Sequence, residues 1–164
     1  MSKPRVEIID PRDVGLRTLD MKTPVFDGEA LARADKTLEA LGGSMEQWLD
    51  ADIERLQIAR QLAAQTHWSA PSVEALAAAA HDLKGVGATY GYPLAGQLAA
   101  SLCRLIESPA GKADAAKNAG LIGAHVDALR AVVRDRIKTD GHATSRALLR
   151  ALEMEVARLD VAPR

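Results

Sequence analysis

The strongest constraint on the fold is the recurrence of apolar residues at helical spacing in a chain that is almost free of aromatic side chains. Alanine supplies about a fifth of all residues, whereas the aromatic types together supply 3%. Alanine, leucine, glutamate, arginine and lysine are strong helix formers, while strands favour β-branched and aromatic residues. We therefore expect an all-α fold built from closely packed helices.

Helical segments can be placed from the apolar spacing and from the residues that start and stop helices. The third segment contains the longest run of alanine. The fourth and fifth segments carry leucine, isoleucine and valine at helical spacing. Four central segments joined by short connections predict an antiparallel four-helix bundle, with a short helix before it and an extra helix after it. The expected helices cover about residues 28–41, 44–65, 71–89, 94–106, 122–140 and 144–160.

Two adjacent glycines predict a break between the first two of these helices. Gly42 and Gly43 are expected to end the short N-terminal helix, because glycine is a poor helix former. Ser44 is then expected to cap the next helix, with Gln47 three residues later completing a capping box. The apolar stripe that this helix would bury includes Trp48 and, near its end, Leu62 or Ala63.

The chain is expected to contain a single main domain. Its 164 residues and 17.5 kDa are ordinary for one domain with tails. Residues 1–27 contain three prolines and little periodicity, which predicts an extended arm, and 6–9 within it are compatible with a short strand. We assign 28–138 to the helical bundle and 139–164 to an accessory C-terminal helix.

Charge and cysteine content narrow the function. The 21 basic and 22 acidic residues give a formal net charge of -1, which offers no reason to expect nucleic acid or an anionic membrane as partner. No apolar stretch is long enough to span a membrane. The single cysteine, Cys103, cannot build a disulfide framework or a thiolate metal site, and we expect it to be a small buried residue in a reducing cytoplasm.

The third segment carries an unusual surface. At about 100° per residue, His81 and Lys84 project opposite the side that faces the core, and their neighbours on the same face are small. A helix face that meets only water has no need to be so flat, because such positions usually carry long polar side chains. We expect this face to bind a partner through its small residues, which are Ala77, Ala78, Gly85 and Ala88.

Two glycines in this segment are expected to have different roles. Gly85 lies beside His81 on the surface, where a helical glycine costs about 1 kcal/mol relative to alanine. The missing side chain would let a partner's backbone approach the imidazole. Gly87 points closer to the core, so we expect it to allow close contact with a neighbouring helix.

An exposed histidine with a nearby lysine favours one chemistry in particular. Neutral imidazole is a good nucleophile near neutral pH and is able to accept and release a phosphoryl group. Lys84, three residues after His81, is close enough to neutralise charge on a phosphoryl group carried by that histidine. The segment has neither a pocket nor a complete set of catalytic groups, so the remaining machinery is expected to come with the partner.

The residues from His81 to Gly85, followed by Gly91 and Leu94, resemble the H-x-L-K-G…G…L signature of the histidine-containing phosphotransfer (HPt) family. This resemblance implies a small helical bundle that relays phosphoryl groups between aspartates of response-regulator receiver domains, including those of hybrid histidine kinases. It implies His81 as phosphoacceptor, Lys84 as electrostatic support and Gly85 as clearance for the partner. It also implies a carrier rather than an enzyme, with Mg²⁺ on the receiver and no metal or cofactor on this chain. We expect this carrier to be a cytoplasmic monomer.

Three other interpretations stay open. His81 is also compatible with an ordinary surface histidine, and the bundle with a dimeric phosphotransferase related to histidine kinases. An HD-type metal phosphohydrolase would need His81 and Asp82 to converge with His67 and Asp127, although adjacent helical residues diverge by about 100°. His67, together with His125 and His142, is otherwise expected to be structural or at the surface.

Overall fold

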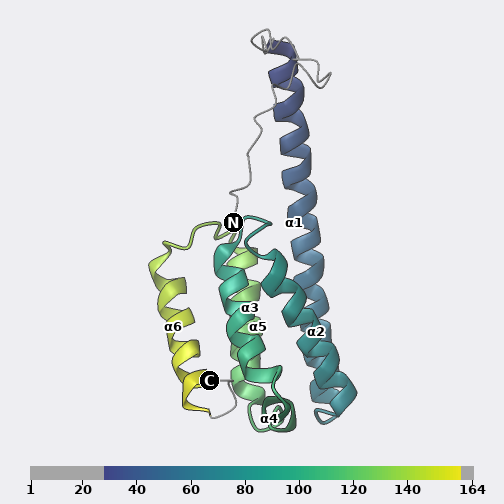
Figure 1. The fold of residues 1–164 in the computed structure, drawn as a ribbon, viewed down its shortest axis with the longest axis vertical. Helices are drawn as coiled ribbons and strands as arrows, with labels where there is room; N and C mark the ends of the chain where they lie inside the picture. The colour runs from purple at the N-terminus through teal and green to yellow at the C-terminus, as the bar shows by residue number, and fades with distance from the viewer. Residues whose placement is uncertain (1–27, 160–164) are drawn as a thin grey trace, which may run out of the picture. The chain divides into compact units, whose positions relative to one another are not determined.

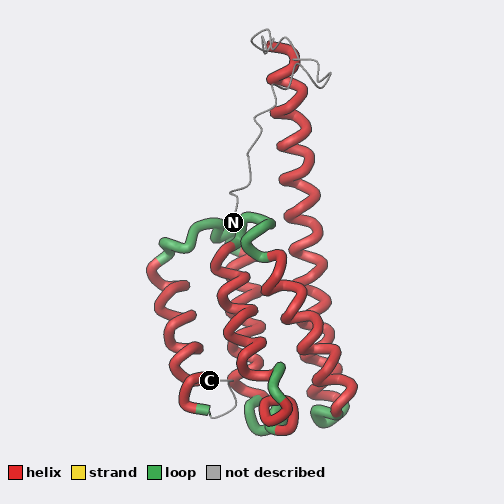
Figure 2. The backbone as a smooth tube through the Cα atoms, viewed as in Figure 1, coloured by secondary structure: helices red, strands yellow, loops and turns green. Residues whose placement is uncertain are grey.

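The computed structural model describes residues 28–159, so the expected arm over 1–27 lies outside the described residues. The chain divides into two units, 1–37 and 38–164. The all-α prediction is confirmed, because every regular element in the described part of the chain is helical (Figure 2). The helices are α1 (Gly28–Gln65), α2 (Ala70–Val86), α3 (Pro93–Ile106), α4 (Pro109–Ala113), α5 (Ala119–Arg134) and α6 (Ala143–Arg158).

α1 is one continuous helix, and the predicted break at Gly42 and Gly43 is wrong. Two glycines cost helix stability but do not prevent a helix when good helix formers flank them on both sides. Ser44 is not a cap either, because its hydroxyl donates to the carbonyl of Ala40 one turn earlier, at 3.1 Å. A capping box with Gln47 is therefore absent.

The long helices of 38–159 run in alternating directions along the chain (Figure 1). α2 packs against α3, α3 packs against α5, and α6 packs against both α3 and α5. α1 lies beside α2, where Arg55 pairs with Asp82 at 3.6 Å, and Ile53 of α1 shares a pocket with Asp127 of α5. α1, α2, α3 and α5 thus surround a common core.

Leucine and alanine form most of this core, as the composition predicted. Cys103 is buried on α3 as expected, with 1% of its surface exposed. Trp48 was placed with the buried stripe of α1, but it is 52% exposed. Of the two alternatives for the end of that stripe, Leu62 is 46% exposed. Ala63 occupies the buried position beside Leu62 and is 0% exposed. The largest fully buried side chains include Tyr92, Leu49, Leu56, Leu76, Leu83, Leu98, Leu102 and Leu129.

Two features of the C-terminal half differ from the sequence prediction. α5 ends at Arg134, short of the expected stop near Asp140. A short helix, α4, occupies part of the segment that was expected to be a break. α6 buries Leu149, Leu152 and Val156 against the bundle. No helix among the described residues is long and apolar enough to cross a membrane.

The turn between α2 and α3 fixes how closely these two helices approach. A Cβ added at Gly87 would lie 2.6 Å from the amide nitrogen of Gly96, so the helix backbones touch here. The expected role of Gly87 in close helix contact is confirmed. Gly91 in the turn has φ of +82°, a backbone conformation that glycine adopts without strain. Tyr92 then closes the turn by donating its N–H to the carbonyl of Gly87 at 2.8 Å.

Candidate functional site

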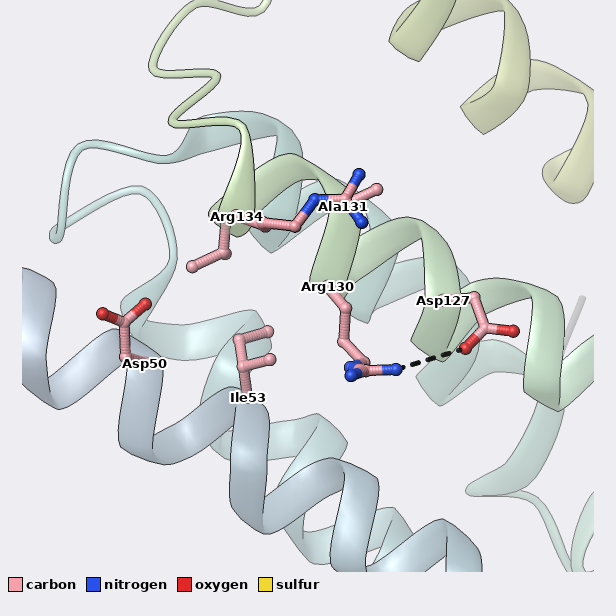
Figure 3. Close-up of a pocket in the computed structure, with 7 residues that line it drawn as sticks. Asp50, Ile53, Asp127, Arg130, Ala131 and Arg134 are labelled. Atoms are coloured by element: carbon pink, nitrogen blue, oxygen red, sulfur yellow. Dashed lines mark ion pairs between the residues drawn. The ribbon is translucent and has the colours of Figure 1, made fainter.

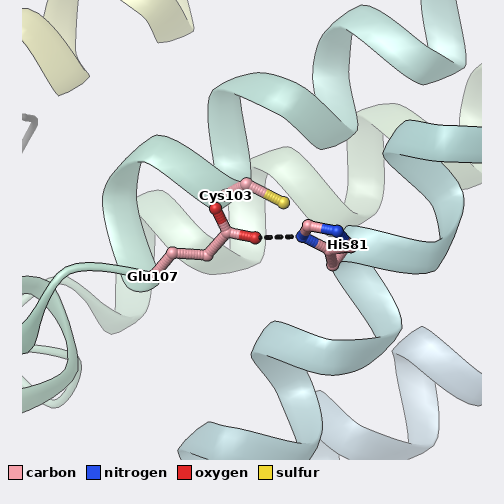
Figure 4. A group of neighbouring side chains, drawn as sticks. All are labelled: His81, Cys103 and Glu107. Atoms are coloured by element: carbon pink, nitrogen blue, oxygen red, sulfur yellow. Dashed lines mark hydrogen bonds and ion pairs between the residues drawn. The ribbon is translucent and has the colours of Figure 1, made fainter.

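His81 projects from α2 into solvent, as the helical wheel predicted, and its side chain is 63% exposed. Its ring nitrogen Nδ1 lies 2.6 Å from Oε1 of Glu107, the residue that follows α3 (Figure 4). An ionised carboxylate only accepts hydrogen bonds, so Nδ1 carries the proton and donates it. No hydrogen bond to Nε2 is found among the described residues. In the neutral ring, the free lone pair therefore lies on Nε2.

The backbone of Glu107 is fixed at the end of α3, because its N–H donates to the carbonyl of Cys103 at 2.8 Å. The side chains of these two residues lie on one helix face because they are four positions apart. Partial burial acts to raise the pKa of Glu107. The hydrogen bonds from His81 and Cys103 and the charge of Lys84 outweigh that effect and lower the pKa below its ordinary value.

Lys84 lies on the Nδ1 side of the imidazole. Its Nζ is 3.3 Å from Nδ1 of His81 and 3.7 Å from Oε2 of Glu107. Since the proton on Nδ1 points to the carboxylate, the favourable interaction of the ammonium is with Glu107 and not with the ring. The side chain is 35% exposed and has a long flexible stem, so it is able to reorient toward a group on Nε2.

Cys103 is the buried neighbour of His81 and Glu107. The atoms that these three residues could offer to a metal, a ring nitrogen of His81, Sγ of Cys103 and a carboxylate oxygen of Glu107, all lie within 4.8 Å of one another. Burial and the negative charge of Glu107 raise the pKa of the Cys103 thiol to about 12, so the thiol is protonated at neutral pH. Cys103 is therefore a neutral side chain in the structure as it stands.

The small residues expected around His81 separate into two groups. Ala78, Gly85 and Ala88 are exposed, but Ala77 is only 5% exposed and belongs to the core cluster. Ala77 was therefore placed wrongly on the open face. Its side of α2 is covered because α2 packs against α3 and α4, and Glu74 one turn earlier pairs with Lys112 of α4.

Gly85 has open space around it. A Cβ added there would meet nothing within 4 Å, so no contact inside the described molecule requires a glycine. Because α2 ends at Val86 and not near residue 89 as expected, Gly85 lies in the last turn of the helix. The cost of glycine at this position is correspondingly smaller than the full mid-helix value.

α1 borders the histidine on one side. Arg55 pairs with Asp82, the residue next to His81, at 3.6 Å. Ile58 follows Arg55 by three positions on α1, so it lies on the same side of that helix, and it is 55% exposed. An apolar side chain therefore stands on the helix that lines the site.

The other histidines have structural positions. His125 is 0% exposed, its Nδ1–H donates to the carbonyl of Leu121 at 2.8 Å, and its Nε2 accepts from the hydroxyl of Ser101 at 3.0 Å. His142 caps α6 by accepting from the backbone N–H of Ser145. His67 lies in the turn after α1 with φ of +53°.

The structure does not support the metal phosphohydrolase interpretation, because the expected ligands do not converge. Among the described residues, the only group of three or more converging metal-binding side chains is His81, Cys103 and Glu107. Asp82 pairs with Arg55 on α1, whereas Asp127 pairs with Arg130 on α5, at 4.0 Å. The ligands that an HD-type site would need therefore do not come together.

A separate pocket of about 490 Å³ lies between α1 and α5 (Figure 3). Its lining includes Asp50, Ile53, Asp127, Arg130 and Arg134. It contains neither a histidine nor a cysteine, and none of the residues around His81 contributes to it. The candidate site is therefore the exposed surface at His81 and not this pocket.

Glu107 and Cys103 were missed as neighbours of His81 by sequence reasoning. A signal for them exists in the spacing around the contact between Gly87 and Gly96. His81 precedes this contact by six residues and Cys103 follows it by seven, which corresponds to about 9 and 10 Å along two antiparallel helices. The spacing becomes informative only once the contact is known.

Comparison with known proteins gives one match. The family model described as Hpt domain matches residues 37–161. A search of curated proteins found no match, and neither did a search of solved structures. The matched range contains α2 with His81, α3 with Glu107, and α6.

Proposed function

This chain belongs to the Hpt domain family, and from that membership we propose that His81 carries a phosphoryl group between the aspartates of two receiver domains. Hpt domains act as carriers in the phosphorelays of two-component signalling, and they interact with receiver domains of response regulators. The observation that carries the proposal for His81 is its geometry. The ring is exposed, its Nδ1 is engaged by Glu107, and its Nε2 is free of hydrogen bonds among the described residues.

The proposed transfer is a displacement at phosphorus. The Nε2 lone pair of His81 attacks the aspartyl phosphate, the N–P bond forms, and the bond from phosphorus to the aspartyl oxygen breaks. The receiver recovers its carboxylate, and the ring keeps its proton on Nδ1 and becomes cationic. The reverse displacement by a second receiver's aspartate returns the neutral ring, so the carrier is unchanged after each cycle.

Glu107 supports this step as a positioning residue. Its hydrogen bond holds the proton on Nδ1, which leaves the lone pair on the nitrogen that faces outward. Its negative charge also stabilises the cationic ring that phosphorylation creates. The lowered pKa of Glu107 keeps its carboxylate ionised at neutral pH.

Lys84 is proposed to change partner during transfer. In the free protein it lies 3.7 Å from Oε2 of Glu107. A phosphoryl group on Nε2 carries about two negative charges, which attract the ammonium more strongly than a single carboxylate does. Reorientation of Lys84 would then place a positive charge on the phosphoryl oxygens.

The proposed docking surface comprises Ala78 and Gly85 of α2, Ala88 in the turn after α2, and Ile58 of α1, around His81. The three small residues leave the surface flat, and Ile58 supplies exposed apolar area. Two receivers that use the same histidine would have to bind in turn, which requires modest affinity. Small residues and one exposed apolar side chain would give such modest affinity, because no large side chain of the partner is buried in a pocket.

The proposed functional unit is one chain. His81, Lys84 and Glu107 all come from the same chain, so the site is complete without a second copy. The monomer therefore remains our proposal over the dimeric kinase-like bundle, and light scattering of the purified protein distinguishes them. The cytoplasmic location and the involvement of hybrid kinases stay predictions.

The test is an assay that follows the transfer of a radiolabelled phosphoryl group from a phosphorylated receiver to this chain. The receivers are the full set from the source organism, which also identifies the partners. The wild-type chain should acquire an acid-labile label, and His81→Gln should acquire none while keeping its helical circular dichroism. His67→Asn is the matched control, because it removes an exposed histidine elsewhere and asparagine tolerates positive φ.

Two results would contradict the proposal. One is a wild-type chain that no receiver labels, and the other is a His81→Gln variant that is still labelled. Loss of label in His67→Asn to the same extent would show that the loss in His81→Gln is not specific to His81, and it would also contradict the proposal.

A further inference from the structure

Three side chains with different donor atoms converge beside the phosphoacceptor. A ring nitrogen of His81, Sγ of Cys103 and a carboxylate oxygen of Glu107 lie within 4.8 Å of one another, and the ring nitrogen that faces the carboxylate is Nδ1, 2.6 Å from Oε1 (Figure 4). They come from α2, from α3 and from the residue after α3. The sequence contains four histidines and one cysteine, and all five lie in the described part of the chain. Within that part, no second group of three or more such donors forms.

Imidazole, thiolate and carboxylate together are a donor set typical of zinc. With bonds of about 2.0–2.3 Å, the ligand atoms of a tetrahedral zinc site lie roughly 3.3–3.7 Å apart. The observed separations of up to 4.8 Å approach this geometry, and the side chains of His81 and Glu107 are 63% and 37% exposed, so they have room to adjust. Mg²⁺ does not suit this set because it prefers oxygen ligands in an octahedron.

We propose that His81, Cys103 and Glu107 bind a zinc ion, and that the bound ion blocks phosphoryl transfer at His81. The expectation of no metal on this chain came from the resemblance, which places Mg²⁺ on the receiver domain, and a single cysteine excluded a site built from thiolates alone. A mixed site assembled across two helices is compatible with one cysteine. The inhibitory half of the proposal rests on the proposed function, whereas the binding half does not.

The inhibition follows from the imidazole tautomer. A neutral ring has one proton and one lone pair, and in the free protein the lone pair is on Nε2. Zinc bound to Nδ1 takes the lone pair there, so the proton must reside on Nε2. Nε2 then has no lone pair with which to attack phosphorus. The thiol proton of Cys103 is released to solvent, because the thiolate is the metal ligand.

Lys84 opposes metal binding. Its ammonium is 3.3 Å from Nδ1 of His81, so a zinc ion at this position would meet a like charge. The flexible side chain must move away for the ion to bind. Lys84→Ala should therefore bind zinc several-fold more tightly than the wild type, an effect opposite to that of removing a ligand.

Binding is tested first on the full chain without any receiver. Zinc is titrated in competition with a chromophoric chelator, and Co²⁺ is used as a spectroscopic substitute because a cobalt–thiolate bond gives a charge-transfer absorption. We expect one zinc per chain and a thiolate band with Co²⁺. Cys103→Ala should lose the band and bind zinc at least tenfold more weakly. His67→Asn should behave as wild type.

Inhibition is then measured as the ratio of transfer rates with and without equimolar zinc, in buffer that contains Mg²⁺. The wild type should fall at least tenfold, and the ratio for Cys103→Ala should stay near one. Because each variant is compared with itself, a change in its basal rate does not affect the result. Cys103→Val provides a second removal of the thiol with similar volume if the alanine variant folds poorly.

Several outcomes would overturn the zinc site. They are absence of the cobalt–thiolate band in the wild type, failure to compete with the chelator, or equal inhibition of wild type and Cys103→Ala. Failure of transfer without zinc would instead refute the proposed function, and the binding measurements would still decide whether the site exists.

Discussion

Oε1 of Glu107 lies 2.6 Å from Nδ1 of His81, although 26 positions separate the two residues in the sequence. The carboxylate follows the end of α3, and the histidine projects from α2. This pairing places the proton of the neutral imidazole on the inward nitrogen and leaves the outward nitrogen with its lone pair. The exposed histidine is thereby prepared as a nucleophile.

Removing Glu107 should slow transfer, because the proton of the His81 ring would no longer be held on Nδ1. Glu107→Ala is expected to reduce the transfer rate about tenfold, which corresponds to about 1.4 kcal/mol of transition-state stabilisation. Glu107→Gln should have a smaller effect, since its amide oxygen still accepts from Nδ1 but carries no charge. Nitrogen chemical shifts of the His81 ring should show a single tautomer in the wild type and a mixture in Glu107→Ala. A single unchanged tautomer in that variant would contradict this role.

Replacing Lys84 should affect transfer and not folding. Lys84→Ala removes a partly exposed ammonium, so the thermal midpoint should change little. Transfer from a receiver should slow by roughly tenfold, because charge on the phosphoryl group is no longer neutralised. Lys84→Arg should restore part of the rate. Full activity of Lys84→Ala in single-turnover transfer would show that the partner supplies all of the positive charge.

Substitution at Gly85 should separate stability from binding. Gly85→Ala is expected to raise the free energy of unfolding by up to about 1 kcal/mol, because alanine is the better helix former and its Cβ meets nothing. Gly85→Leu should weaken receiver binding at least tenfold while the protein remains folded. Calorimetry for unfolding and titration with a receiver for affinity measure the two effects. Unchanged affinity of Gly85→Leu would remove the clearance role.

Gly87 provides the contrast two residues away. A Cβ there would lie 2.6 Å from a backbone atom of Gly96, so α2 and α3 would have to separate. Gly87→Ala should therefore destabilise the protein by about 1–3 kcal/mol, despite better helix propensity. Denaturant unfolding of the two alanine variants should give changes of opposite sign.

His125 should make stability depend on pH. Burial lowers its pKa in the folded protein, although the backbone hydrogen bond to Leu121 acts in the opposite direction. Below the ordinary histidine pKa of about 6.5, the unfolded chain binds a proton that the folded chain does not, so stability falls as the pH is lowered. The loss continues downward until the pH reaches the lowered pKa of the folded state.

The measurement is the thermal midpoint between pH 7.5 and pH 5. His125→Gln has no titrating ring, so its midpoint should fall less over this interval than that of the wild type. The variant is expected to be less stable at pH 7.5, because the ring packs in the core. Only the slope is diagnostic, and equal slopes would assign the acid sensitivity to other groups.

Ile58 should contribute to receiver affinity. Ile58→Ser exchanges an exposed side chain, so folding should change by less than about 0.5 kcal/mol. Its loss should weaken receiver binding several-fold because apolar contact area disappears. Met154→Ser on α6 is the matched control, with an exposure of 59%. Equal effects of the two substitutions on titration with a receiver would place the docking surface elsewhere.

The position of His81 could be deduced without the structure, because it follows from local geometry. Helical periodicity placed the apolar side of this segment in the core and His81 opposite it, and the ring is exposed. Gly87 was assigned to a helix contact by the same reasoning. The error at Ala77 arose because a helical wheel shows directions on one helix and not what α4 covers.

The break expected at Gly42 and Gly43 failed for a different reason. Propensity is a small free-energy difference per residue, and favourable neighbours on both sides outweighed two unfavourable residues. Trp48 and Leu62 fit the spacing of a buried stripe, yet they lie at its edge in the folded helix. Periodicity gives the direction of a stripe more reliably than its width.

The sequence by itself determined that the chain is helical and that one histidine projects from an alanine-rich surface, since both depend on residues within a few turns of each other. Only the tertiary structure decided what stands next to that histidine. Glu107 and Cys103 reach His81 because α2 and α3 touch at Gly87 and Gly96, and the distance of closest approach between two helices is a property of their packing.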